Sequence, residues 1–275
     1  MPDIPVLTGH DGARVPAIGL GTYDLRGADG VRQVRTAIDA GYRLLDTAFN
    51  YDNEGVVGRA IAESGVPRAE FVYSTKLPGR YHRHDLARKA IEESLYRSGL
   101  DRLDLVLIHW PNPQRGLYAE AWRALVEARA DGLVSMIGVS NFLPEHLDRV
   151  IGDTGVTPVL NQILVNPYTP HDAWRAANAE RGILTEGYTP LGKGSDLADD
   201  PVVTAIAADH GVSASRLLLA WSVAIGVIPL PKSGNAARQA ENLDVFGIEL
   251  TDDELGRLAS LSRGGGADPD THEEL

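Results

Sequence analysis

Three ionisable side chains stand at the ends of three successive apolar runs, roughly thirty residues apart. They are Asp46, Lys76 and His109, and Tyr51 follows the first of them in the next loop. A phenol is a weak acid with an ordinary pKa near 10, and a neighbouring ammonium lowers that pKa. A carboxylate would keep the lysine charged, and a histidine would hydrogen-bond the oxygen that the phenol addresses. This group would protonate a carbonyl oxygen as hydride arrives, or deprotonate an alcohol as hydride leaves.

Each of these residues also has a structural interpretation when it is taken alone. An Asp at a strand end is often the cap of the next helix. A Lys at the rim of a fold is usually solvated at its charged end, and a His there is more often a hydrogen-bonded structural group. The occurrence of all three types at consecutive strand ends, beside a tyrosine, favours the catalytic interpretation.

The elements that must position these residues alternate along the whole chain. Short apolar runs predict strands at 17–20, 43–46, 71–75, 103–108, 134–139, 159–162, 183–185 and 227–230. Amphipathic stretches predict helices at 31–40, 53–64, 85–98, 118–130, 144–151, 171–180, 201–209, 213–224 and 236–243. Continuous apolar strands are typical of a parallel sheet covered on both faces. Eight such units in 275 residues indicate an α/β fold, a (β/α)₈ TIM barrel, whose active sites lie at the carboxyl ends of the strands.

A doubly wound open sheet is the alternative architecture. Such a sheet usually carries a glycine-rich phosphate loop after its first strand, and Gly19-Leu20-Gly21-Thr22 supplies only a fragment of that motif. We expect one barrel domain over residues 1–275. An Asp-Gly turn predicts an N-terminal β-hairpin at about 4–15, and a run of three glycines predicts a flexible C-terminal tail at about 264–275.

Composition narrows the class of partner. The chain has 26 Lys and Arg against 38 Asp and Glu, a net charge of −12, which argues against nucleic acid and against an anionic membrane surface. Cysteine is absent, which excludes disulfides and thiolate chemistry. Neither a signal peptide nor a membrane-spanning apolar run is visible, so we expect a soluble, cytoplasmic protein. His82 and His84 share a predicted solvated loop without a third ligand, so we expect no metal site.

Longer motifs, in the same order and spacing, show that the chain resembles the aldo-keto reductases over essentially its whole length. Within that family it is most similar to the bacterial 2,5-diketo-D-gluconic acid reductase branch. The matching segments are Gly19–Thr22, Asp46–Ala48 with Tyr51, Asn53-Glu54, Thr75–Leu77, Ile108–Pro111, Gly138–Phe142, Asn161-Gln162, Asn166–Tyr168, Tyr188–Gly192, Pro231–Ser233, Arg238 and Glu241-Asn242.

The resemblance implies a barrel without a separate Rossmann domain, which binds NADP(H) across its mouth. It implies that Tyr51 is the general acid/base, that Asp46 and Lys76 tune it, and that His109 orients a small-molecule carbonyl substrate. The implied cofactor contacts are Ser140, Asn141, Gln162 and Tyr188 at the nicotinamide, Glu241 and Asn242 at the adenine, and also Thr22, Asp46, Leu191 and Gly192. The predicted substrate pocket contains Tyr23, Phe49, Asn50, His109 and Trp110. The resemblance also suggests a monomer.

A phosphate site is expected after the eighth predicted strand. Lys232, Ser233 and Arg238 place two cations and a hydroxyl at the start of a predicted helix, where barrels often bind phosphate. Arg can also stack on an adenine ring while it bonds to a phosphate. These residues predict that NADPH is preferred over NADH. The alternative is that they form a solvent-exposed helix start whose cations bind no phosphate.

Some positions depart from the family pattern, and two other functions compete. Thr189 stands where serine is common, and Glu186-Gly187 before Tyr188 is also unusual. Leu164 stands where the family commonly has an acidic residue, which could alter packing behind the nicotinamide. A nucleotide-binding regulatory protein would keep the cofactor site with incidental turnover, but it would have no need for the complete set of four catalytic residues. A Schiff-base aldolase on the same fold would use Lys76, but such a lysine works best uncharged, and Asp46 would keep it charged.

Overall fold

A computed structural model describes residues 4–274; residues 1–3 and 275, at the ends of the predicted domain and tail, lie outside the described residues. Eight parallel strands form one sheet, in which neighbours in the sheet are neighbours in the chain. The strands are β3 (Gly19–Gly21), β4 (Leu44–Asp46), β5 (Val72–Leu77), β6 (Leu103–Ile108), β7 (Val134–Ser140), β8 (Leu160–Leu164), β9 (Leu184–Tyr188) and β10 (Val227–Leu230).

The first and last strands of this sheet meet at a seam. The amide of Gly21 donates to the carbonyl of Pro231 at 3.1 Å, and an isolated parallel bridge pairs Gly21 with Lys232. This contact brings the two edges of the sheet together, so the predicted (β/α)₈ barrel is confirmed.

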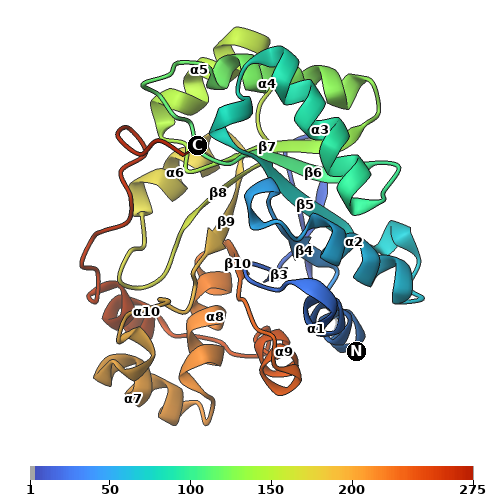
Figure 1. Cartoon of the computed structure of the whole chain (residues 1–275). Helices are drawn as coiled ribbons and strands as arrows, with labels where there is room; N and C mark the ends of the chain where they lie inside the picture. The colour runs from blue at the N-terminus through green and yellow to red at the C-terminus, as the bar shows by residue number, and fades with distance from the viewer. Residues whose placement is uncertain (1–3, 275) are drawn as a thin grey trace.

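Helices surround the barrel on its outside (Figure 1). They are α1 (Gly27–Ala40), α2 (Glu54–Glu63), α3 (His84–Ser98), α4 (Tyr118–Ala130), α5 (Pro144–Thr154), α6 (Asp172–Glu180), α7 (Pro201–Asp209), α8 (Ala214–Ala224), α9 (Ala236–Leu243) and α10 (Asp252–Ala259). Side chains cap several helix starts: Asp200 accepts from the amide of Val202, and Thr251 forms a capping box with Glu254. These caps fix where the connecting loops end.

No single helix in the described part of the chain is long and apolar enough to cross a membrane. Only α7 and α8 satisfy the length and composition criteria as a pair, and that pair is bent by 89°. Both helices bury apolar side chains in one core cluster, among them Val203 and Leu217.

The predicted N-terminal hairpin is present and contributes to the barrel core. Strands β1 (Val6–Thr8) and β2 (Arg14–Pro16) pair antiparallel. Val15 is fully buried and packs with side chains of the barrel strands, including Leu44, Leu105 and Leu160. The hairpin therefore contributes an apolar plug, which stabilises the barrel through burial.

Strand β9 is longer than the apolar pattern predicted. It continues through Glu186 and Gly187 to Tyr188, because Glu186 pairs in register with Gln162 of β8 and is fully buried. A Cβ atom on Gly187 would lie 2.8 Å from Cγ1 of Val227. The strand therefore has no room for a side chain at this position. This explains why glycine occurs here, although glycine weakens strand propensity.

The C-terminal segment 268–274 lies against the barrel. After α10 the chain passes α6 and ends beside α5 (Figure 1). His146 of α5 forms an ion pair with Asp270 at 3.1 Å, and the ring of His272 lies 4.0 Å from that of Trp110. Glu273 accepts from the amide of Gln114 at 3.0 Å. The flexibility predicted for the tail stays a prediction, and this conformation places the segment at the mouth of the barrel.

Candidate active site

A pocket of about 530 Å³ opens at the carboxyl ends of the barrel strands. It is lined by Gly21, Thr22, Tyr23, Asp24, Asp46, Tyr51, His109, Trp110, Ser140, Asn141, Gln162, Tyr188, Thr189, Pro190, Leu191, Lys193, Leu230, Pro231 and Lys232. Three of these residues, Asp24, Asn141 and Thr189, have positive φ angles of 64°, 61° and 54°. Left-handed backbone at non-glycine residues is costly and gathers at functional sites.

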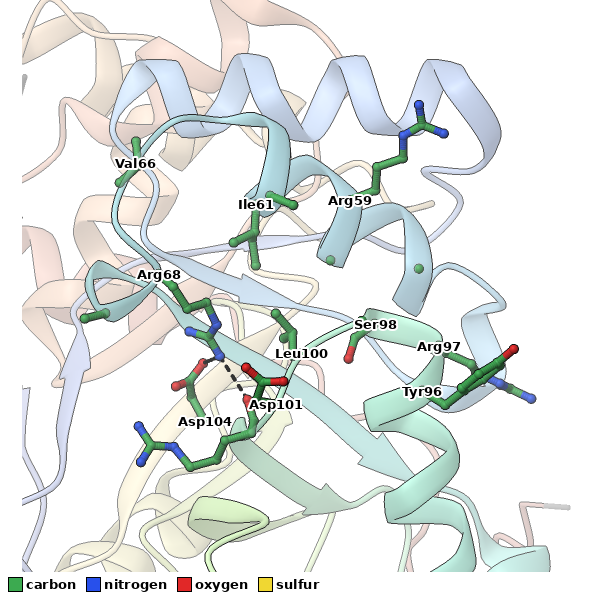
Figure 2. A pocket seen from close by; sticks show the side chains of 16 residues that line it. Arg59, Ile61, Val66, Arg68, Tyr96, Arg97, Ser98, Leu100, Asp101 and Asp104 are labelled. Atoms are coloured by element: carbon green, nitrogen blue, oxygen red, sulfur yellow. Dashed lines mark hydrogen bonds and ion pairs between the residues drawn. The ribbon is translucent and has the colours of Figure 1, made fainter.

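A larger groove, of about 1070 Å³, lies between α2, the end of α3 and the segments before β5 and β6 (Figure 2). Three of its arginines pair with acids: Arg68 with Asp104, Arg97 with Glu93 and Arg59 with Glu63. Neither a histidine nor a lysine lines it. The smaller pocket is therefore the candidate site for acid–base chemistry.

Asp46 lines the pocket, and its ion pair with Lys76 lies beneath the lining. Asp46 is the last residue of β4, and Lys76 lies on the neighbouring strand β5. The ammonium also donates to the carbonyl of Thr47 at 2.8 Å. Burial lowers the pKa of Lys76, but Asp46, together with Tyr51 and Glu186, outweighs burial and holds that pKa above its ordinary value. The lysine is therefore charged at neutral pH.

Tyr51 is brought to this pair by a short 3₁₀ helix, Phe49–Tyr51, directly after β4. The Lys76 Nζ atom lies 5.2 Å from the centre of the Tyr51 ring. Burial raises the pKa of Tyr51, and the charge of Lys76 opposes that increase. The net direction is upward, so the phenol is protonated and can serve as a proton donor.

His109 completes the group from the end of β6. Its amide donates to the carbonyl of Leu77 at 3.0 Å, which fixes it beside β5. The ring centres of Tyr51 and His109 are 6.0 Å apart with an edge-to-face geometry. Tyr23 packs on the other side of Tyr51 at 5.1 Å. The four predicted catalytic residues thus lie together at one end of the barrel.

A second set of predicted residues forms a polar network along one wall of the pocket. Ser140 donates to the carbonyl of Gln162 at 2.8 Å, and the Tyr188 hydroxyl donates to Oδ1 of Asn141 at 3.0 Å. Asn141 donates to the carbonyl of His109 at 3.1 Å. This wall of amides and hydroxyls, with an aromatic ring beside it, suits a planar ring that carries a carboxamide.

Glu186 lies behind this wall, and the sequence assigned no role to it. The Gln162 side-chain amide donates to Asp46 at 3.0 Å and to Glu186 at 2.6 Å, so one amide bridges two carboxyl groups. Burial, and then the charge of Asp46, raise the pKa of Glu186 to about 8. At neutral pH this acid is therefore largely protonated.

The predicted phosphate-binding residues flank the loop between β10 and α9. Lys232 and Arg238 are exposed, and no ion pair joins either of them to an acid within residues 4–274. Ser233 is buried, and its carbonyl accepts from the buried amide of Gln239 at 2.8 Å. The loop is therefore held from below, while its two cations remain available to an anion.

Several predicted contacts lie outside the lining of the pocket. Phe49 is buried against Tyr81 and Arg97, and Asn50 bonds to Arg80 and Glu274. The cofactor candidates beyond the lining are Gly192, Ser233, Arg238, Glu241 and Asn242. Of these, Asn242 is buried and Glu241 is half-buried on α9.

Lys193 lines the pocket but was absent from the sequence interpretation, and Leu164, which departs from the family pattern, lies outside the lining. Lys193 lies over the ring of Tyr23 at 4.7 Å from a loop after β9, a contact for which the sequence gives no signal. Leu164 packs near Gly266 of the tail, since a Cβ atom on Gly266 would lie 3.1 Å from Cδ2 of Leu164.

The prediction of a solvated loop is wrong for His82. This residue is fully buried, and burial lowers its pKa to about 4. Its neighbours in sequence, Tyr81 and His84, remain partly exposed. Among residues 4–274, no three His, Asp or Glu side chains are grouped to hold a metal ion.

Comparison with known proteins agrees with this geometry. The profile of the Aldo/keto reductase family matches residues 17–263. The chain belongs to the aldo/keto reductase family. It is 47% identical over 277 residues to 2,5-diketo-D-gluconic acid reductase B of Corynebacterium sp. (strain SHS752001), with all of both chains covered. It is 43% identical to an aldo-keto reductase of Mycolicibacterium smegmatis, covering 97% of this chain and 96% of the relative.

Solved structures of the family superpose closely on the chain. The apo form of Gox0644 gives a TM-score of 0.94 at 39% identity, covering 99% of this chain and 100% of that one. The Bombyx mori aldo-keto reductase, solved in complex with NADP, gives 0.89 at 35% identity, covering 96% and 94%. The family predicted from the motifs is therefore confirmed, and the protein is an oxidoreductase of this family.

Proposed function

We propose that this aldo/keto reductase is an NADPH-dependent carbonyl reductase in which Tyr51 is the general acid. The observation that carries the proposal is the arrangement of a protonated phenol beside a buried, charged lysine and a histidine at one pocket. A variant of Gox0644, a relative of similar fold, was solved in complex with NADPH. When bound, NADPH supplies the hydride.

The residues of the chain fit that cofactor. The donors and acceptors of Ser140, Asn141 and Gln162 match a carboxamide, and Tyr188 offers a ring for stacking. At the other end Lys232 and Arg238 are cations without acidic partners in the described structure, which suits the additional phosphate of NADPH. We therefore propose that NADPH is preferred over NADH.

In the reductive direction Tyr51 donates its proton to the carbonyl oxygen. The charge of Lys76 stabilises the phenolate that remains, and Asp46 holds Lys76 in place. His109 orients the carbonyl oxygen toward the phenol. The rings of Tyr23 and Trp110 at the pocket limit the access of water to the reacting carbon. The single-domain organisation, monomeric state and cytoplasmic location expected from the sequence stay predictions.

The decisive experiment compares the native protein with Tyr51→Phe. NADPH oxidation is measured across a panel of aldehydes, ketones and sugar keto acids, and NADPH binding is followed by fluorescence. We expect turnover by the native protein and its loss in Tyr51→Phe, with NADPH binding unchanged. Tyr96→Phe, at an exposed position on α3, is the matched control and should behave as the native protein. Binding of NADPH without turnover of any carbonyl would reject the proposal in favour of a nucleotide-binding regulatory protein.

A further inference from the structure

The catalytic histidine has a carboxylate neighbour that comes from the far end of the chain. Oε1 of Glu274 lies 2.7 Å from Nδ1 of His109, at ion-pair distance. Both side chains are largely buried, with 13% of His109 and 14% of Glu274 exposed. Glu274 is not among the residues that line the pocket, so it contacts the ring from outside the cavity.

This carboxylate is held in place by other contacts. The Asn50 side chain donates to the same Oε1 atom at 2.8 Å. The Asn112 side chain makes two hydrogen bonds to the backbone of Glu274. Its amide nitrogen donates to the Glu274 carbonyl, and its Oδ1 accepts from the Glu274 amide at 3.3 Å. The side chain therefore approaches His109 from a fixed backbone rather than from a free end.

Further contacts tie the same segment to the loop that carries His109 and to α5. His272 packs on Trp110, and Glu273 bonds to the amide of Gln114. Asp270 pairs with His146 of α5. The segment thus covers the outer side of residues 109–115.

The chemistry of the contact follows from the groups involved. A carboxylate only accepts hydrogen bonds, so the His109 nitrogen that faces it must carry a proton. Nε2 is then the nitrogen that is left for a ligand. A carbonyl oxygen also only accepts, so it needs a proton on Nε2 as well.

We propose that Glu274 is a positioning residue, which holds a proton on Nδ1 of His109 and keeps Nε2 directed to the substrate oxygen. The proposal rests on the carbonyl reductase function proposed above. Its structural logic is that of a base oriented by a third group. The other charged groups around Glu274 are Arg80, which bonds to Asn50, and Arg115, which pairs with Glu273. The buried His82 is a further titratable neighbour, and its lowered pKa keeps it neutral at neutral pH.

The test compares Glu274→Gln with Glu273→Gln, its neighbour, which contacts the same loop but not His109. With NADPH and the best carbonyl of the panel, we expect kcat of Glu274→Gln to fall about tenfold, the lower end of losses when a carboxylate that orients a histidine is removed. The KM for NADPH should not change, and Glu273→Gln should retain its kcat. In a His109→Gln background, Glu274→Gln should have no further effect. Equal losses in the two backgrounds, or equal losses in Glu274→Gln and Glu273→Gln, would overturn the proposal.

A second measurement does not depend on turnover. Side-chain ¹⁵N spectra of histidine, with His109 assigned by its absence in His109→Gln, report which ring nitrogen carries the proton. We expect a proton on Nδ1 in the native protein and a loss of proton population from Nδ1 in Glu274→Gln. A His109 spectrum that is unchanged by Glu274→Gln would refute the positioning role, even if no carbonyl were turned over and the reductase function itself had failed.

Discussion

The Lys76 ammonium lies 2.7 Å from each carboxylate oxygen of Asp46, with 0% of the lysine side chain exposed. Such a pair is held together because each charge would be very unfavourable alone in the protein interior. If Lys76 tunes Tyr51 as proposed, the pair couples catalysis to stability, since the same lysine is a buried charge that needs its partner.

Removing one member of this pair should destabilise the fold. Lys76→Met leaves the Asp46 carboxylate buried and unpaired, and we expect a loss of about 3 kcal/mol in the free energy of unfolding. The double variant Asp46→Asn with Lys76→Met should recover part of that loss while remaining inactive. Urea unfolding of the native protein, Lys76→Met, Asp46→Asn and the double variant measures both effects. Losses that simply add in the double variant would contradict the coupling.

Glu186 should make stability depend on pH in a defined direction. Its pKa in the folded chain is about 8, against an ordinary value near 4.3. The folded state therefore binds a proton that the unfolded state has released. The stabilising contribution is complete below about pH 4.3 and is lost as pH rises toward 8, by about 1.4 kcal/mol per pH unit.

The matched comparison is Glu186→Gln, which keeps a neutral group of the same shape. Urea unfolding between pH 5 and 8 should show the native protein losing stability relative to Glu186→Gln as pH rises. Glu92→Gln, at an exposed site on α3, should run parallel to the native protein. A constant difference between the native protein and Glu186→Gln at all pH values would show that Glu186 does not titrate in this range.

The cations after β10 should set the choice of cofactor. Lys232→Ala and Arg238→Ala are each expected to raise the KM for NADPH about tenfold, because a charge-assisted hydrogen bond contributes about 1.5–3 kcal/mol. The KM for NADH should change by less than twofold. Lys89→Ala, which removes an exposed cation from α3, is the control for net charge. Equal weakening of both cofactors would place these cations away from the additional phosphate.

Two glycines should respond to alanine in opposite directions. Gly187→Ala places a Cβ atom 2.8 Å from Val227, and overpacking of this kind costs about 1–3 kcal/mol. Gly152 lies on α5 with nothing near its missing side chain, so Gly152→Ala should stabilise by about 0.5–1 kcal/mol. Thermal unfolding of both variants checks the two signs, and a neutral Gly187→Ala would show that β9 relaxes locally.

The sequence predicted the features that depend on local patterns, namely the strands and the polar residues at their ends. Strands such as β6 are nearly continuous apolar runs. Asp46, Lys76 and His109 stand at or just after the ends of their strands at a regular interval, so the barrel places them together. Phe49 shows the limit of this reasoning. It is adjacent to the pocket in sequence, but the 3₁₀ turn directs its ring toward Tyr81 and Arg97.

The residues that sequence reasoning missed depend on contacts between distant segments. Glu274 meets Asn50 across almost the full length of the chain, and no periodicity records such a pairing. Glu186 interrupts an apolar strand, and its burial is possible only because Gln162 of the neighbouring strand is there to bond it. The role of a polar residue in a buried strand can thus be inferred only when its hydrogen-bond partner is known.

The seam between β3 and β10 has a consequence for how the molecule melts. It is closed by one short bridge at Gly21 and Lys232, and Thr22 and Lys232 on its two sides both line the pocket. A dinucleotide bound to both residues would hold β3 and the end of β10 together where the sheet closes. Saturation at a hundred times Kd adds about 2.7 kcal/mol to the folded state. On binding of the dinucleotide, exchange of backbone amides near the seam should slow more than exchange elsewhere. The bound coenzyme would then also stabilise the closure of the barrel.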